Sequence, residues 1–145
     1  MKTRVFSGRL FAVMEKGESV AQDLRDLAAL VPSPGSAAIV TGLGMVRNTN
    51  LGYGLYDGKS ATYKKIIIED NTEVLALSGF LIKDKELPFH VHISLGDGEM
   101  RVFGGHLFDA EVVTFLELCL DLSHLPLSRK LKDGLPEMKL GEPEV

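Results

Sequence analysis

Three neighbouring segments decide the fold: TEVLALSGFLI (72–82), LPFHVHISL (87–95) and EMRVFGGHLF (99–108). Each is short and rich in β-branched or aromatic residues, which favour strands. Turn-forming residues separate them, most clearly Asp97-Gly98 between the second and the third. Connections this short join antiparallel neighbours, because a parallel crossover needs a dozen residues or more. The stretch therefore predicts an antiparallel sheet.

The strand pattern continues on both sides, and one segment breaks it. Further strand-like segments lie at residues 4–15, 36–46, 49–57, 61–69 and 110–120. The exception is ESVAQDLRDLAALV (18–31), where Val20, Leu24 and Leu27 recur at helical spacing behind the suitable N-cap Ser19. The sequence thus predicts an α+β fold with a largely antiparallel β-sheet and one main α-helix.

Length and composition are those of one globular domain. The chain has 145 residues, 45% of them hydrophobic and 25% charged, with a formal net charge of -4. We expect a single domain over residues 1–125, followed by an irregular segment over 126–145, where prolines recur. The acidic balance argues against a surface that coats polyanions, because such a surface needs clustered Lys and Arg.

Cysteine use and hydropathy predict a cytoplasmic protein with no membrane partner. Cys119 is the one cysteine, so the chain cannot form an internal disulfide. No stretch of the sequence approaches the roughly 20 consecutive apolar residues that a membrane-spanning helix needs.

His90 and His92 are the residues that carry the clearest chemical signal. They are two positions apart on a predicted strand, so their side chains share one face. Two imidazoles about 7 Å apart along a strand can converge on one ion, and neutral imidazole is a favoured zinc ligand. The alternative is an ordinary surface or packed pair that binds no metal.

Whether His106 joins this pair depends on the register of the hairpin. A two-residue turn at Asp97-Gly98 places His106 opposite Phe89, on the wrong face of the sheet. A three-residue loop, or a bulge at Gly104-Gly105, places it opposite His90 instead. A three-histidine site therefore requires one extra residue on the second limb of the hairpin.

Two further residues are candidates for chemistry near such a site. Arg47 follows a glycine-rich bend and could hold an anionic ligand, or else be solvated or in a surface ion pair. Glu111, five residues after His106, could act as a general base toward a metal-bound water, or else be a solvated carboxylate at a strand start. His124 lies in a predicted loop and is expected to be a bystander.

The order of these segments resembles the plants-and-prokaryotes conserved (PPC) domain family in its prokaryotic stand-alone form. The likeness runs from about Arg4 to about Leu120. The matching motifs are Arg9-Leu10, Gly17-Glu18, Val40-Thr41-Gly42-Leu43-Gly44, Leu51-Gly52-Tyr53, LALSG (75–79), HVHISLG (90–96) and GGHL (104–107). The last two of these motifs are the most specific.

The resemblance implies a strongly bent sheet, a homotrimer, and zinc held by His90, His92 and His106. The fold is also similar to that of acetolactate decarboxylase, which uses three histidines on zinc with a nearby arginine and glutamate. By that analogy Arg47 and Glu111 are the candidate catalytic residues. Plant relatives carry an Arg-Gly-Arg-Pro AT-hook, which this chain lacks, so DNA is not an expected partner.

Two functions of different classes follow. The first is a zinc-binding trimeric domain that acts on or senses a small anionic metabolite, because three histidines leave one zinc position open. The alternative is a non-enzymatic DNA-associated or assembly module, related to the plant AT-hook proteins, in which any metal is structural.

Overall fold

The structure, a computed structural model, describes residues 1–32, 35–84, 86–124 and 126–141. In these residues one helix accompanies nine strands, which fits an α+β fold with a small helical share. The elements are β1 (Lys2–Phe6), β2 (Arg9–Glu15), α1 (Val20–Leu30), β3 (Ser36–Tyr56), β4 (Ala61–Ile68), β5 (Thr72–Ile82), β6 (Phe89–Gly96), β7 (Val102–Ser123), β8 (Ser128–Lys132) and β9 (Leu135–Lys139).

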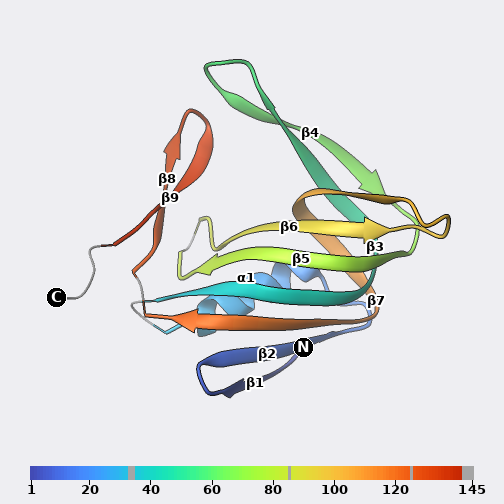
Figure 1. Cartoon of the computed structure of the whole chain (residues 1–145), viewed down its shortest axis with the longest axis horizontal. Helices are drawn as coiled ribbons and strands as arrows, with labels where there is room; N and C mark the ends of the chain where they lie inside the picture. Colours follow the sequence, from blue (N-terminus) through green and yellow to red (C-terminus); the bar gives the residue numbers. More distant parts are fainter. Residues whose placement is uncertain (33–34, 85, 125, 142–145) are drawn as a thin grey trace.

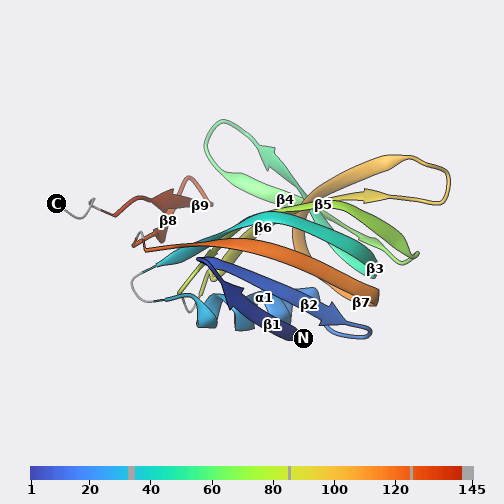
Figure 2. The ribbon, with the colours of Figure 1, turned by 60° about the horizontal axis from the view of Figure 1, so that its bottom comes forward.

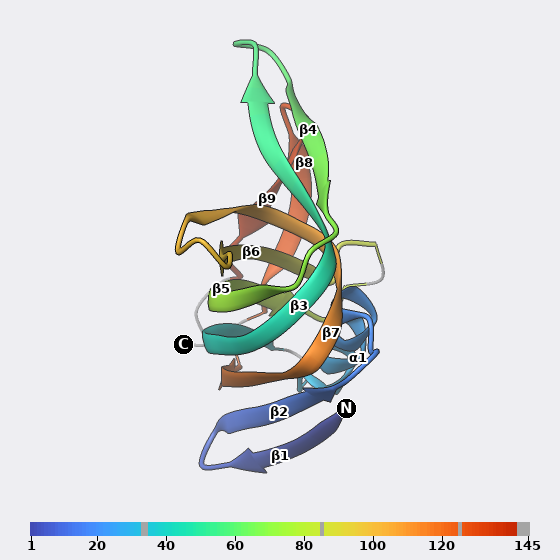
Figure 3. The ribbon, with the colours of Figure 1, turned by 90° about the vertical axis from the view of Figure 1, so that its right-hand side faces the viewer.

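Seven strands form the main sheet, in the order β1-β2-β7-β6-β5-β3-β4 (Figure 1). Every pairing among the described strands is antiparallel, which confirms the predicted sheet. β3 also pairs with β7, so the strands β7, β6, β5 and β3 close into a ring. This closure bends the sheet back on itself and leaves β4, with the part of β3 that pairs with it, standing above it (Figure 3).

β3 and β7 make the bend possible because they are long and irregular. They have 21 and 22 residues, where the sequence predicted two separate strands in each region. Their mutual register shifts at four places, between Ile39 and Thr41 and at three points from Gly44 to Leu51. Bulges of this kind turn a strand without ending it, because they add local twist. The four predicted strands are therefore two, each bent where a break was expected.

The helix α1 lies across one face of the sheet and closes the hydrophobic core (Figure 2). Its apolar stripe, including Leu24 and Leu27, is buried, as predicted. Ser19 caps the helix, since its side chain accepts a hydrogen bond from the Gln22 backbone N–H. Asp109 of β7 anchors the same end, because its Oδ1 accepts from the Ser19 hydroxyl and from the Ala21 N–H, at 2.9 and 3.0 Å.

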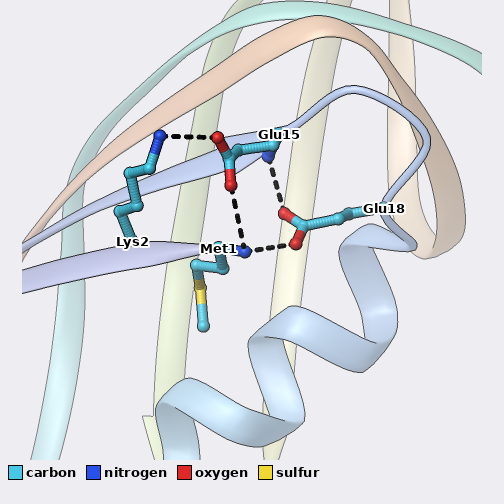
Figure 4. Close-up of polar contacts among 4 residues, drawn as sticks. All are labelled: Met1, Lys2, Glu15 and Glu18. Atoms are coloured by element: carbon cyan, nitrogen blue, oxygen red, sulfur yellow. Dashed lines mark hydrogen bonds and ion pairs between the residues drawn. The ribbon is translucent and has the colours of Figure 1, made fainter.

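The N-terminal segment differs from the prediction of one strand over residues 4–15. It is a hairpin of β1 and β2, joined at Ser7 and Gly8, which both have positive φ (48° and 77°). A turn with two positive φ angles suits the twist of a two-residue hairpin, and Ser-Gly supplies it. Two ion pairs hold this end of the chain in place (Figure 4). Lys2 Nζ lies 2.7 Å from Glu15 Oε1 within the hairpin, and the Met1 ammonium contacts Glu18 just before α1.

The C-terminal segment is also more regular than predicted. The irregular segment expected over 126–145 contains the hairpin β8–β9, which forms a separate two-stranded sheet. Asp133 and Gly134 form its turn, with φ of 52° and 82°. Pro136 is accommodated because a two-stranded ribbon offers edge positions that need no N–H donor. The prediction was wrong because it weighed the prolines above the Asp-Gly turn signal.

No helix in the described part of the chain is long and apolar enough to cross a membrane.

Candidate metal centre

β6 divides its side chains between two environments. Val91, Ile93 and Leu95 point into the core under α1, and their exposed fractions are 0 to 2%. Because side chains alternate along a strand, His90 and His92 lie together on the opposite face. The pairing of the two histidines on one face is therefore as predicted.

His106 of β7 reaches the same face through a register that the sequence did not suggest. It pairs with His92 rather than with His90, because the β6–β7 loop is longer than either predicted turn. The backbone N–H of Asp97 donates to the Arg101 carbonyl oxygen at 3.1 Å, and the Asp97 side chain accepts from the Glu99 and Arg101 amides. No bulge occurs at Gly104-Gly105, which pair regularly with Ser94 and Ile93.

The three imidazoles converge. One nitrogen of each ring lies within 4.8 Å of one nitrogen of each of the others. The Nε2 atoms of His90 and His92 are 3.2 Å apart. Two ligand nitrogens at about 2.0–2.1 Å from a tetrahedral ion would be roughly 3.3 Å apart, so this separation suits a shared metal.

Aromatic side chains support His106 from β4 and β7. Tyr63 stacks on its ring with centroids 4.9 Å apart, and Phe108 meets it edge-on at 4.7 Å. Gly52 makes room for both, because a Cβ there would lie 2.5 Å from the Phe108 ring and 2.9 Å from Tyr63. These supports were missed by sequence reasoning, although Leu51-Gly52-Tyr53 was noted as a motif.

The environment keeps two of the rings neutral. Burial lowers the pKa of His106 to about 4, and the neighbouring His90 and His92 add to that shift. Burial also lowers the pKa of His90, with a further contribution from Arg129. The Nδ1 atom of His106 is buried and has no hydrogen-bond partner in the described residues. Neutral rings with free lone pairs are the ligating form of histidine, so the donor set fits a metal ion.

Arg47 and Glu111 lie elsewhere and contact each other. The Arg47 Nη2 and Glu111 Oε1 atoms are 2.6 Å apart, and Asn48 donates to the other Glu111 oxygen at 3.1 Å. Hydrogen bonding from Arg47 lowers the pKa of the Glu111 carboxyl. Five residues of β7 separate Glu111 from His106, or about 16 Å along a strand. The structure thus brings these two residues together but away from the histidines, and their catalytic roles stay predictions.

Two other features adjoin the histidines. A hollow of about 310 Å³ lies beside His90 and His92. Its other lining residues come from β3 and β5: Ala38, Ile39, Ser78, Gly79 and Phe80. On the other side, the β8–β9 hairpin places Arg129 Nη1 3.5 Å from His90 Nδ1. Sequence reasoning missed Arg129, and only the Asp133-Gly134 turn signal could have directed attention to its hairpin.

Most of the chain matches a known family of protein domains. The sequence model of the Plants and Prokaryotes Conserved (PCC) domain matches residues 3–122. The chain belongs to this family. The match confirms the resemblance on which the PPC assignment was based, and it ends just before the C-terminal hairpin. No curated protein matches the sequence.

Solved structures of PPC proteins are similar over nearly the whole chain. The plant- and prokaryote-conserved protein of Pyrococcus horikoshii is 28% identical, with a TM-score of 0.76 over 99% of this chain and 96% of its own. The metal-containing protein of Archaeoglobus fulgidus is also 28% identical, with a TM-score of 0.73 over 94% and 95%. A Bacteroides thetaiotaomicron protein shares the fold at 17% identity, with a TM-score of 0.80 over 95% and 96%.

Proposed function

We propose that this PPC domain is a zinc-binding protein that acts on or senses a small anionic metabolite. The observation that carries the proposal is the convergence of His90, His92 and His106 within 4.8 Å, with a buried and unpartnered His106 nitrogen. The metal-containing Archaeoglobus relative supports a metal in this fold. Zinc is the metal proposed because three neutral imidazoles suit its ligand preference.

The residues around the proposed metal site have different roles. His90, His92 and His106 would hold the ion, and Tyr63 and Phe108 hold the His106 ring against rotation. A zinc with three histidine ligands keeps a position for substrate or water, where it polarises a carbonyl or lowers the pKa of water. The hollow beside His90 and His92 gives a small molecule room to approach.

Metal analysis of the untagged protein tests the proposal. We expect one zinc per chain by elemental analysis of metal-replete protein, and its loss in His92→Ala. The His92 side chain is exposed, so this variant should fold. His124→Ala is the matched control, because His124 is exposed and lies outside the cluster. Folded wild-type protein that holds only traces of zinc would end the proposal.

We further propose that the protein assembles as a homotrimer. Apolar side chains are exposed on the outer face of β2, β3 and β7: Phe11 (45%), Val13 (37%), Leu43 (49%) and Phe115 (48%). Val13 and Leu43 lie on either side of the exposed Glu117 of β7, so apolar side chains from three strands gather around one carboxylate. Contiguous exposed apolar surface marks protein interfaces. Light scattering should give three times the chain mass, and Phe11→Asp should reduce it.

DNA binding is the second candidate, because a protein from Bacteroides thetaiotaomicron and one from Ralstonia eutropha carry a proposed DNA-binding role in their names. Both are 20% identical or less, so their likeness concerns the fold alone. The net charge of -4 disfavours phosphate contacts. We expect no shift of duplex DNA in a low-salt gel; tight, salt-dependent binding would favour this candidate instead.

A further inference from the structure

Arg129 is a buried charge on the C-terminal hairpin. Its side chain is only 9% exposed, although an arginine stays protonated at all ordinary pH values. The guanidinium lies beside the candidate metal centre, with Nη1 3.5 Å from His90 Nδ1 and 3.4 Å from the Pro136 carbonyl oxygen. Arg129 is thus held between the hairpin and the first histidine of the cluster.

One edge of this guanidinium has no partner. Its Nε and Nη2 atoms are both buried and make no hydrogen bond in the described residues. Burial lowers the pKa of Arg129, and the nearby Asp84 carboxylate opposes that shift. Asp84, however, uses its Oδ1 to accept the amides of Glu86 and Leu87, at 2.8 and 2.9 Å. The Nε and Nη2 donors form the fork that binds a carboxylate bidentately, and here the fork is empty.

His90 adds another donor to the same place. Its Nε2 faces His92 in the metal centre. A histidine that binds a metal through Nε2 carries its proton on Nδ1, and that N–H needs an acceptor. The group beside His90 Nδ1 is Arg129, which has only donors. The Nε and Nη2 atoms of Arg129 therefore lack an acceptor, and a metal-bound His90 would add an Nδ1–H that has none either, which is unfavourable in a buried site.

The hairpin that carries Arg129 can admit an acceptor. β8 and β9 pair with each other in a sheet of their own, and no ladder in the described residues joins them to the main sheet. The hairpin stands beside the start of β6, where His90 lies (Figure 1). Its turn contacts the main sheet through the Asp133 carbonyl oxygen, which accepts the Ala61 N–H at 3.1 Å. A displacement of Arg129 from His90 would therefore break no strand pair of the main sheet.

We infer that Arg129 binds the carboxylate of a small acid that occupies the metal centre, and that this binding closes the β8–β9 hairpin. A carboxylate supplies two coplanar oxygens for the Nε and Nη2 donors. This inference rests on the proposed metal site at the neighbouring histidines. It gives the role of anion anchor to Arg129, because Glu111 already neutralises Arg47.

Titration with acetate at constant ionic strength tests the inference on the full chain loaded with zinc. Acetate should raise the unfolding temperature and slow amide exchange over residues 128–139, while uncharged acetamide should do neither. Arg129→Gln should weaken acetate binding by about tenfold or more, because two charge-assisted hydrogen bonds are lost. The matched control is Lys130→Gln, which removes the same charge from an exposed neighbour on β8 and should bind acetate normally.

Arg129→Lys keeps the charge without the planar fork, so it should bind acetate more weakly than wild type and better than Arg129→Gln. It also serves if the Gln variant does not fold. Equal acetate affinity in wild type and either folded Arg129 variant overturns the inference. Repeating the titration without zinc separates the two proposals. If acetate binding depends on Arg129 but the protein takes up no zinc, the role of Arg129 stands and the metal site is refuted. If zinc uptake is normal but acetate binding does not depend on Arg129, the metal site stands and the role of Arg129 is refuted.

Discussion

The two faces of β6 show how one strand serves stability and chemistry at once. Its inner face, with Val91, Ile93 and Leu95, is fully packed, and its exposed fraction is near zero. Its outer face places His90 and His92 beside His106, where ring nitrogens face each other and donors lack acceptors. The inner face is satisfied within the chain, whereas the outer face keeps the His106 Nδ1 atom without a hydrogen-bond partner among the described residues. Functional sites commonly hold such unmet groups, and a packed scaffold maintains them.

The largest predicted change in stability concerns the inner face of β6. Leu95→Ala removes a fully buried side chain and should lower the free energy of unfolding by about 2–5 kcal/mol. Chemical denaturation measures the loss, and zinc stoichiometry of the folded variant should stay at the wild-type value. A variant that kept its stability but lost zinc would mean that the two faces are not separable.

Zinc should stabilise the protein through the outer face alone. At a free concentration of 100 times the dissociation constant, an ion that binds only the folded state adds about 2.7 kcal/mol. His106→Gln should abolish this gain, while its metal-free stability should remain close to that of metal-free wild type. Thermal unfolding with and without a chelator gives both values. An equal zinc response in wild type and His106→Gln would contradict the ligand assignment.

Asp23, a buried residue of α1, tests by pH the packed side of the sheet that the helix covers. Burial, and then Glu18, raises the pKa of its carboxyl to about 6, from an ordinary value of 3.8. The folded state therefore holds the proton more tightly than the unfolded state, so this group favours folding at low pH. That advantage is lost as pH rises from about 4 through 6. Asp23→Asn should be more stable than wild type by about 1–2 kcal/mol at pH 8 and nearly equal at pH 4. A constant difference across denaturation curves from pH 4 to 8 would contradict the burial argument.

The smallest effect should come from the Arg47–Glu111 pair, in which Arg47 is exposed and Glu111 is partly exposed. Arg47→Gln should leave zinc content and acetate affinity unchanged, because the pair lies away from the histidines. Exposed ion pairs also contribute little to stability. A clear loss of acetate binding in this variant, measured beside Arg129→Gln, would return the anchor role to Arg47.

Local pattern predicted much of the fold and part of the site. The alternation in FHVHISL placed His90 and His92 on one face, and the spacing of Val20, Leu24 and Leu27 identified α1. The three histidines share a face although the register differs from the prediction. The longer loop pairs His106 with His92 instead of His90, a shift of two residues, and a shift of two residues keeps a side chain on the same face. Because His90 and His92 are two residues apart on β6, pairing His106 with either of them brings the three rings together.

Features that depend on distant contacts could not be read from local pattern. β3 has Gly44 and Asn48 at its bulges and β7 has Asp109, residues that favour turns, and only the mutual pairing of the two strands keeps each one continuous. Arg129 meets His90 across 39 positions of sequence, through a hairpin that lies beyond the family match. In the sequence, Arg129 looks like a solvated charged residue in a proline-containing tail. Its burial depends on how the β8–β9 hairpin packs, which the local pattern does not show.

The position of β7 in the sheet has a consequence for how the chain is made. β7 is the strand that pairs with β2, β3 and β6, and β2 contacts it through pairs such as Arg9 with Asp121. During synthesis the first hairpin and α1 leave the ribosome long before their main partner exists. Contacts so remote in sequence form slowly, because a long loop must close first. Until about residue 120 emerges, β2 and α1 lack the strand against which they pack, so the nascent chain exposes apolar surface and an unpaired strand edge.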